Sequence, residues 1–294
     1  MRLSLFLIIL LLSPVLSAGE RVKVVTSFSI LADITQQVGG KHVEIINLVD
    51  PDSDAHVYET TPDDARHVAA ADLIVENGLH FEPWLERLVR SSDTQAKVIR
   101  ASQGIIPRTL EEDGHAVADP HAWNSLANAK LYASNIAKAL EQVDPGHVQD
   151  YRANLAAYTQ QIDALLLEVR KRFAALPPGN RKIVTSHDAF GYLGQAYGIT
   201  FVAPQGLSTE REASAREVAD LITLIRKEGI KAVFIENIKA PRLLQQIADE
   251  TGAGIGGTLH SDALAARGPA SSYLGMYRLN VQTITQALGG QIAE

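Results

Sequence analysis

The stretch "DPGHVQDYRANLAAYTQQIDALLLEVRKRFAALPPGNR", from Asp144 to Arg181, decides the fold. Apolar residues recur in it at steps of three and four, the period of one buried helix face; they are Val148, Tyr151, Leu155, Tyr158, Ile162, Leu165, Val169 and Phe173. Asp144 and Pro145 predict the start of this helix, and Pro177-Pro178-Gly179 its end. A helix of about 30 residues is roughly 45 Å long. Because that exceeds one small domain, we expect the helix to brace two.

Strand-like and helix-like segments alternate on both sides of this helix, which is typical of parallel sheets covered by helices. The fold class predicted is α/β, with two Rossmann-like lobes joined by one long backbone helix. The predicted divisions are a signal peptide at 1–18, an N-terminal lobe at 19–143, the connecting helix at 144–176 and a C-terminal lobe at 177–294. Two capping boxes are expected at helix starts, one from Thr61 to Asp64 and one from Thr209 to Glu212.

The N-terminus reads as a secretory signal. Arg2 precedes an apolar run at 3–12, and a small residue, Ala18, marks the expected cleavage point. The alternative, a membrane anchor, needs about 20 apolar residues, and Ser13 and Pro14 break this run. The chain contains no cysteine, so no lipid-modified cysteine can follow the signal. These features predict a periplasmic protein that is secreted with a cleaved signal peptide and is not lipidated.

Composition excludes several function classes. The net charge of −7 argues against a nucleic-acid partner, since such proteins are usually basic. The segment "GAGIGG" at Gly252–Gly257 matches a dinucleotide pattern, but it follows a helix-like segment and leads into a strand, the reverse of the required order. Without cysteine thiolates, a metal would have to be held by histidines and carboxylates.

Four metal-ligand side chains occupy similar topological places. His56, in "DPDSDAHVYET", and His121, in "DPHAW", belong to the first lobe; His187, in "VTSHDAF", and Asp262, in "TLHSDAL", directly follow strands of the second. Ligand sites in parallel sheets form beyond the carboxyl ends of strands. A lone loop histidine is usually a surface residue, but three histidines and one aspartate, two residues from each lobe, predict a site in the cleft. Three imidazoles and one carboxylate suit tetrahedral Zn²⁺, whereas Mn²⁺ prefers more oxygen ligands.

Other residues are weaker candidates. His80 and His260 are possible cleft residues, Glu236 ends a strand and is expected to tune the charge of the site, and Asp119 is expected either to orient the ring of His121 or to cap the following helix. The remaining histidines are expected on the surface; they are His42, His67, His115 and His147.

Nearly the whole mature chain resembles the periplasmic solute-binding proteins of zinc and manganese ABC transporters. The resemblance rests on blocks in the family order, which are "SFSILADITQQVGG", "PDSDAHVYETTPDDARHVAAADLIVENGLHFEPWLERL", "DPHAW", "SHDAFGYLGQAYGI" and "SDALAARGPASSYLGMYRLNVQTI". It implies one metal in the cleft, with ligands at His56, His121, His187 and Asp262. At position 187 manganese-type members carry glutamate, so the histidine favours zinc. The chain lacks the long histidine-rich loop that many zinc-type members carry before the second ligand, and this puts a metal-collecting role for that segment in doubt.

The resemblance implies a monomer, not an enzyme, that binds one Zn²⁺ and passes it to a membrane-embedded ABC permease. A periplasmic metallochaperone is a further candidate partner. The alternatives are a manganese or iron protein of the same transporter class and, in a different class, a zinc hydrolase in which Asp262 acts as a general base.

Overall fold

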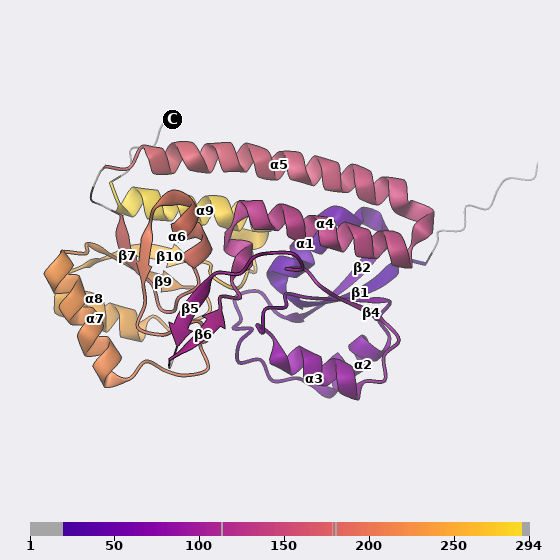
Figure 1. Cartoon of the computed structure of the whole chain (residues 1–294), viewed down its shortest axis with the longest axis horizontal. Helices are drawn as coiled ribbons and strands as arrows, with labels where there is room; N and C mark the ends of the chain where they lie inside the picture. The colour runs from indigo at the N-terminus through magenta and orange to yellow at the C-terminus, as the bar shows by residue number, and fades with distance from the viewer. Residues whose placement is uncertain (1–19, 113, 178, 180, 290–294) are drawn as a thin grey trace, which may run out of the picture.

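Two lobes lie side by side under one long helix (Figure 1). The computed structural model describes residues 20–112, 114–177, 179 and 181–289. The expected signal peptide lies outside these residues and stays a prediction. Each lobe is built on a parallel four-stranded sheet, so the predicted α/β class with two lobes is confirmed.

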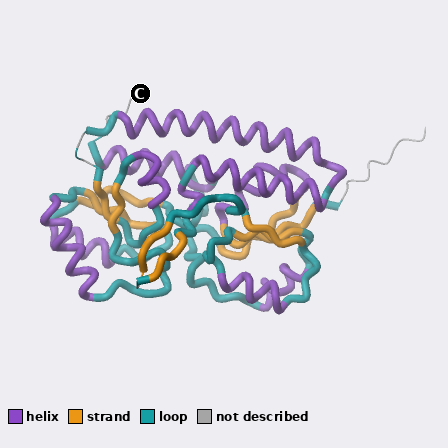
Figure 2. Tube along the Cα trace, in the orientation of Figure 1, coloured by secondary structure: helices purple, strands orange, loops and turns teal. Residues whose placement is uncertain are grey.

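The two sheets follow one plan. In the first lobe the strand order is β2-β1-β3-β4, made of β1 (Val22–Phe28), β2 (Val43–Val49), β3 (Leu73–Glu76) and β4 (Lys97–Arg100). In the second lobe the order is β10-β9-β7-β8, made of β7 (Lys182–Val184), β8 (Thr200–Val202), β9 (Ala232–Glu236) and β10 (Gly254–Leu259). The loops that follow these strands gather between the two sheets (Figure 2).

Helices flank both sheets. Those of the first lobe are α1 (Ser29–Gly39), α2 (Pro62–Ala69), α3 (Pro83–Ser91) and α4 (Leu126–Val143). Those of the second are α6 (Gly191–Tyr197), α7 (Ala215–Glu228), α8 (Arg242–Thr251) and α9 (Tyr273–Ala287). An antiparallel hairpin of β5 (Thr109–Glu112) and β6 (His115–Ala118) was not expected from the sequence.

The connecting helix α5 (Val148–Ala174) has 27 residues and spans both lobes (Figure 1), a length of about 40 Å. It packs against α1 and α4 of the first lobe and against α9 of the second. Six of the eight residues of the predicted apolar stripe are buried, and Val148 and Leu155 are half-buried. The α-helix begins at Val148 rather than at Pro145, because Pro145–His147 form a separate 3-10 turn. The numerical domain boundaries stay a prediction.

One expected capping box is present and the other is not. The side chain of Thr61 accepts the amide of Asp64 at the start of α2, as predicted. The second box was placed wrongly, because α7 is capped by Ser214 with Glu217. The Thr209 hydroxyl instead donates to Asp54 of the other lobe across 2.7 Å. Thr209, which the local pattern predicted to be a helix cap, therefore forms a contact between the lobes instead.

The lobes share a continuous core and polar contacts. One buried cluster runs from Val22 in β1 to Leu288 after α9. The indole N–H of Trp123 donates to the carbonyl of Ser261 across 2.8 Å, and the amide of Leu264 donates to Ser29 Oγ across 2.9 Å. These bonds hold the loop after β10 against the first lobe. Within the described residues, no helix is long and apolar enough to cross a membrane.

Candidate metal centre

The four predicted side chains meet between the lobes. His56 lies in the loop after β2, and His121 lies just before a short 3-10 turn, η2 (Ala122–Asn124). His187 and Asp262 follow β7 and β10 at equivalent positions, three residues after each strand ends. One ligand atom of each residue lies within 4.8 Å of the other three. Segments far apart in the chain thus bring three imidazoles and a carboxylate to one point.

The distances between these atoms match the edges of a small coordination polyhedron. His56 Nε2 lies 3.4 Å from His121 Nε2 and 3.3 Å from Asp262 Oδ2. Asp262 Oδ2 lies 3.0 Å from His187 Nε2, and Asp262 Oδ1 lies 3.7 Å from His121 Nε2. A tetrahedron with zinc–nitrogen bonds of 2.0–2.1 Å has edges of about 3.3 Å. The four separations lie close to this edge, and all four ligand atoms lie within 4.8 Å of one another, so the cluster has the size of a single-ion site.

Some of the atoms that face this point lack hydrogen-bond partners. His121, His187 and Asp262 are fully buried, and His56 is 7% exposed. Both carboxylate oxygens of Asp262 and Nε2 of His187 have no hydrogen-bond partner. Buried polar atoms are rarely left unsatisfied in native proteins, and a buried carboxylate needs a compensating charge. A bound cation satisfies all of these atoms at once.

A carboxylate supports His121 from behind. Asp119 Oδ1 lies 2.9 Å from Nδ1 of His121 and also accepts the backbone amide of that residue. This contact leaves Nε2 to face the centre, as in the carboxylate–histidine–metal arrangement of many metal sites. Asp119 is itself paired with Arg108 through its other oxygen. Of the two roles expected for Asp119, the structure shows the orienting one.

His187 has a similar support in Glu236, the last residue of β9. Glu236 Oε2 lies 2.7 Å from His187 Nδ1, and Oε1 accepts the backbone amides of Ser186 and His187. Glu236 is buried and contacts the ring on the side away from the centre. It was expected only to tune charge, and the structure adds that it orients the ring.

The buried charges act strongly on each other. Burial by itself lowers the pKa of His187, but the charges of Glu236 and Asp262 outweigh it and hold that pKa well above its usual value. Burial raises the pKa of Asp262, but the neighbouring imidazoles bring it well below its usual value. For His56, burial lowers the pKa. The centre therefore has two buried anionic groups opposite imidazoles, an environment that favours a divalent cation.

Aromatic rings close the apolar side of the centre. Phe81 lies edge-on to His56, with ring centroids 4.7 Å apart, and Trp123 lies edge-on to His121 at 5.2 Å. Both aromatic side chains are buried. Such walls exclude water and strengthen electrostatic interactions inside the site.

The weaker candidates lie outside the four-residue cluster. His260 is buried, its amide donates to Asn280, and burial lowers its pKa. His80 is exposed at the mouth of a cavity that reaches His56. His42 and His147 were expected on the surface; both are half-buried, and their rings stack at 3.8 Å. The contact could not be predicted from local sequence, because His42 follows α1 and His147 precedes α5, about a hundred residues later in the chain.

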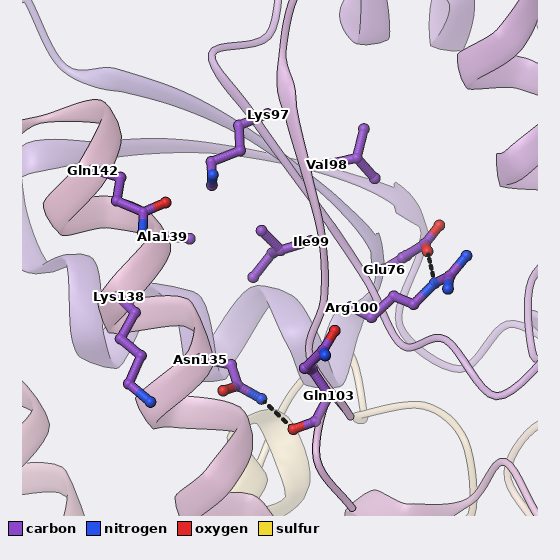
Figure 3. A pocket seen from close by; sticks show the side chains of 10 residues that line it. All are labelled: Glu76, Lys97, Val98, Ile99, Arg100, Gln103, Asn135, Lys138, Ala139 and Gln142. Carbon is purple, nitrogen blue, oxygen red and sulfur yellow. Dashed lines mark hydrogen bonds and ion pairs between the residues drawn. The ribbon is translucent and has the colours of Figure 1, made fainter.

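A separate cavity of about 440 Å³ lies between β4 and α4, away from the centre (Figure 3). Arg100 points toward Glu76 and pairs with it at 2.9 Å, and Asn135 donates to the carbonyl of Gln103 at 2.9 Å. None of the four clustered residues lines this cavity.

Comparison with known proteins matches the chain over most of its length. The sequence profile of the family described as "Zinc-uptake complex component A periplasmic" matches residues 24–287. The chain is 36% identical over 274 residues to the iron-binding protein YfeA of Yersinia pestis, covering 92% of this chain and 88% of that protein. It is 33% identical over 279 residues to the manganese-binding lipoprotein MntA of Bacillus subtilis (strain 168), covering 92% and 91%.

Solved structures give the same result. The periplasmic zinc-binding protein TroA of Treponema pallidum superposes with a TM-score of 0.86 at 31% identity, covering 91% of this chain and 99% of that one. The sequence comparison and the structure comparison therefore find the same kind of protein. The names of these relatives mention iron, manganese and zinc.

Proposed function

Because the chain belongs to the periplasmic zinc-uptake component A family, the metal-binding solute-binding proteins of ABC transporters, we propose that it binds Zn²⁺ between its lobes and delivers it to a membrane permease. The proposed ligands are His56, His121, His187 and Asp262, and one ion is bound per chain. The observation that carries this proposal is the convergence of three Nε2 atoms and one carboxylate within 4.8 Å.

Zinc is favoured by the donor set and its spacing. Three neutral imidazoles with one carboxylate form a common zinc environment, and three of the separations, 3.4 Å, 3.3 Å and 3.0 Å, are close to tetrahedral edges. Four protein ligands close the coordination shell, which is typical of binding rather than catalysis. Asp262 Oδ2 lies 3.3 Å from His56 Nε2 and 3.0 Å from His187 Nε2, which supports a ligand role over the hydrolase alternative, where it would act as a base.

A manganese or iron cargo is the second candidate, and two observations favour it. The relatives YfeA and MntA are named for iron and manganese. Both oxygens of Asp262 also lie within 3.7 Å of imidazole nitrogens of the cluster, so a bidentate carboxylate would raise the coordination number to five. Higher coordination numbers with more oxygen ligands suit Mn²⁺ better than Zn²⁺.

The experiment is a comparison of metals on the purified mature chain. Zn²⁺ binds most sites more tightly than Mn²⁺, so affinity alone does not discriminate and the geometry must be read as well. Substitution with Co²⁺ gives intense visible absorption in a tetrahedral site and weak absorption in a five- or six-coordinate one. We expect the intense spectrum and one equivalent of metal, and we expect Asp262→Asn to lose both, whereas His67→Gln, at a half-buried position on α2, should keep them. A weak spectrum with preferential Mn²⁺ retention would favour the second candidate.

Delivery is proposed to involve only a small movement. The loop that carries Asp262 is bonded to the first lobe through Ser261 and Leu264, and α5 braces both lobes. Docking on the permease would displace this loop or shift the lobes slightly, breaking one or two ligand bonds. Small-angle scattering of metal-free and metal-loaded protein should give nearly equal radii of gyration; a wide opening would contradict this route. The metallochaperone partner and the monomeric state stay predictions.

A further inference from the structure

The centre has one side that faces solvent, and that side is at His56. The other three clustered residues are 0% exposed, whereas His56 is 7% exposed. A cavity of about 210 Å³ reaches His56 from the surface. Its walls come from both lobes, because Phe81 and Val117 line it from the first lobe and Leu207 from the second. An ion that moves between solvent and the centre without opening the lobes would pass through this cavity.

The walls of the cavity are mostly apolar, and two groups able to bind a cation stand among them. His80 lines it from the first lobe and Glu210 from the second, and both residues are exposed. An imidazole and a carboxylate are the same donor types as those at the centre. A cation that leaves its hydration shell in an apolar passage needs such groups along the way.

The backbone at His80 is held in a costly conformation. Gly78, Leu79 and His80 have φ angles of 81°, 55° and 61°, three successive residues in the left-handed region. Non-glycine residues visit this region rarely, and strain of this kind persists only where surrounding structure fixes it, most often at functional sites.

Hydrogen bonds of two buried side chains hold the turn at residues 78–80 in this conformation. The side-chain amide of Asn77 donates to the carbonyls of Gly78 and Pro120 at 2.9 Å and 3.0 Å. Glu82 accepts from the hydroxyl of Ser27 at 2.8 Å and from the amide of Asn77. As a result the turn places Phe81 against His56 inside and leaves His80 at the mouth.

We propose that His80 and Glu210 form a transient, low-affinity cation site at the mouth of the His56 cavity, through which the divalent ion enters and leaves the centre. This inference rests on the proposed metal-binding function. A transient site on the route lowers the barrier in both directions. Removing it therefore slows association and dissociation by the same factor and leaves the equilibrium affinity unchanged.

The test uses the metal-free mature protein and Zn²⁺ released from a buffered chelate, followed by rapid-mixing fluorescence. The reporter is Trp123, whose ring lies 5.2 Å from that of His121. His80→Asn suits the position because asparagine tolerates the left-handed region. Glu210→Gln removes the charge at an exposed site, and His67→Gln, on α2 outside the cavity, is the matched control.

We expect both mouth variants to bind Zn²⁺ more slowly by about tenfold, within the range that local charge changes association rates, with an unchanged Kd and with no change in the control. Unchanged association rates in both variants would overturn the inference. A weakened Kd at an unchanged association rate would also overturn it, because His80 would then act on the centre itself. A wild-type protein that takes up no metal at equilibrium would instead refute the proposed function, so the two failures are distinguishable.

Discussion

Replacing Glu236 by glutamine tests whether this side chain fixes the tautomer of His187. Glu236 Oε1 accepts two backbone amides, at 2.7 Å and 3.1 Å, while Oε2 lies 2.7 Å from His187 Nδ1. Glutamine has only one acceptor oxygen. If that oxygen keeps its contacts with the two backbone amides, the NH₂ group of the glutamine side chain faces His187 Nδ1. Nδ1 must then be unprotonated to accept a hydrogen bond. The proton moves to Nε2, the atom that faces the centre, and the imidazole can no longer bind metal there.

The expected effect is the loss of one supporting contact behind a metal-binding imidazole. Losing one supporting contact of this kind costs about 10–100-fold in metal affinity, which is about 1.4–2.7 kcal/mol. Asp119→Asn is the matched comparison at the other supported histidine. Asp119 Oδ1 alone accepts both the amide and Nδ1 of His121, at 3.0 Å and 2.9 Å. An asparagine oxygen can keep both contacts and loses only the pairing with Arg108, so we expect a loss below about tenfold.

The assay is a competition titration of both variants and wild type against a zinc chelator of known affinity, at fixed pH and salt. Circular dichroism and thermal melting of the metal-free proteins check that each variant is folded. Equal affinities for wild type and Glu236→Gln would refute the tautomer argument. A larger loss in Asp119→Asn than in Glu236→Gln would refute the atom-by-atom comparison on which it rests.

Three further outcomes are expected. His187→Glu should shift the preference from Zn²⁺ toward Mn²⁺ by adding an oxygen ligand, read as the ratio of the two dissociation constants; an unchanged ratio would remove the selectivity argument from position 187. Glu236 and Asp262 hold the pKa of His187 well above its usual value, so metal binding must displace a proton from this imidazole. Zn²⁺ affinity should therefore rise about tenfold per pH unit below that pKa. Calorimetry in buffers of different ionisation enthalpy should detect the released proton, and no release would contradict the ligand set. Burial raises the pKa of Glu82 to about 8, above its unfolded value, so the folded state holds the extra proton and stability falls as pH rises. Between pH 6 and 8 the free energy of unfolding of the metal-free wild type should drop by about 2 kcal/mol relative to that of Glu82→Gln. Urea unfolding measures both free energies, and the same pH dependence in the two proteins would show the inference to be wrong.

Sequence patterns predicted the features that local chemistry determines. The apolar stripe from Tyr151 to Phe173 follows from helix period alone, and the structure buries that face. The cap at Thr61 follows from a four-residue pattern that needs no partner elsewhere in the chain. Strands ahead of His187 and Asp262 could be predicted from their apolar and β-branched residues, but β7 and β10 each end three residues before that side chain rather than directly before it.

Local patterns failed where a distant residue competed for the same group. Both Thr209 with Glu212 and Ser214 with Glu217 match the capping-box pattern, and only the second is used. The first is lost because the Thr209 hydroxyl is bonded to Asp54, which lies far away in the sequence and in the other lobe. The local sequence alone cannot show which of two equal capping patterns is used when a contact with a residue far away in the chain decides between them.

The centre shows the same division between what is local and what is not. His56, His187 and Asp262 could be proposed because each follows a strand of a parallel sheet, where ligand sites form, whereas His121 follows the β5–β6 hairpin. The support of His121 by Asp119 was one of two roles expected from the sequence, whereas the support of His187 by Glu236 was not, because a carboxylate 49 residues away leaves no spacing signal. Glu236 supports His187 from a neighbouring strand, whereas Asp119 supports His121 from two residues away, and yet the two contacts are alike. The position of an oxygen relative to Nδ1, rather than its place in the chain, is therefore what determines which nitrogen is free to bind metal.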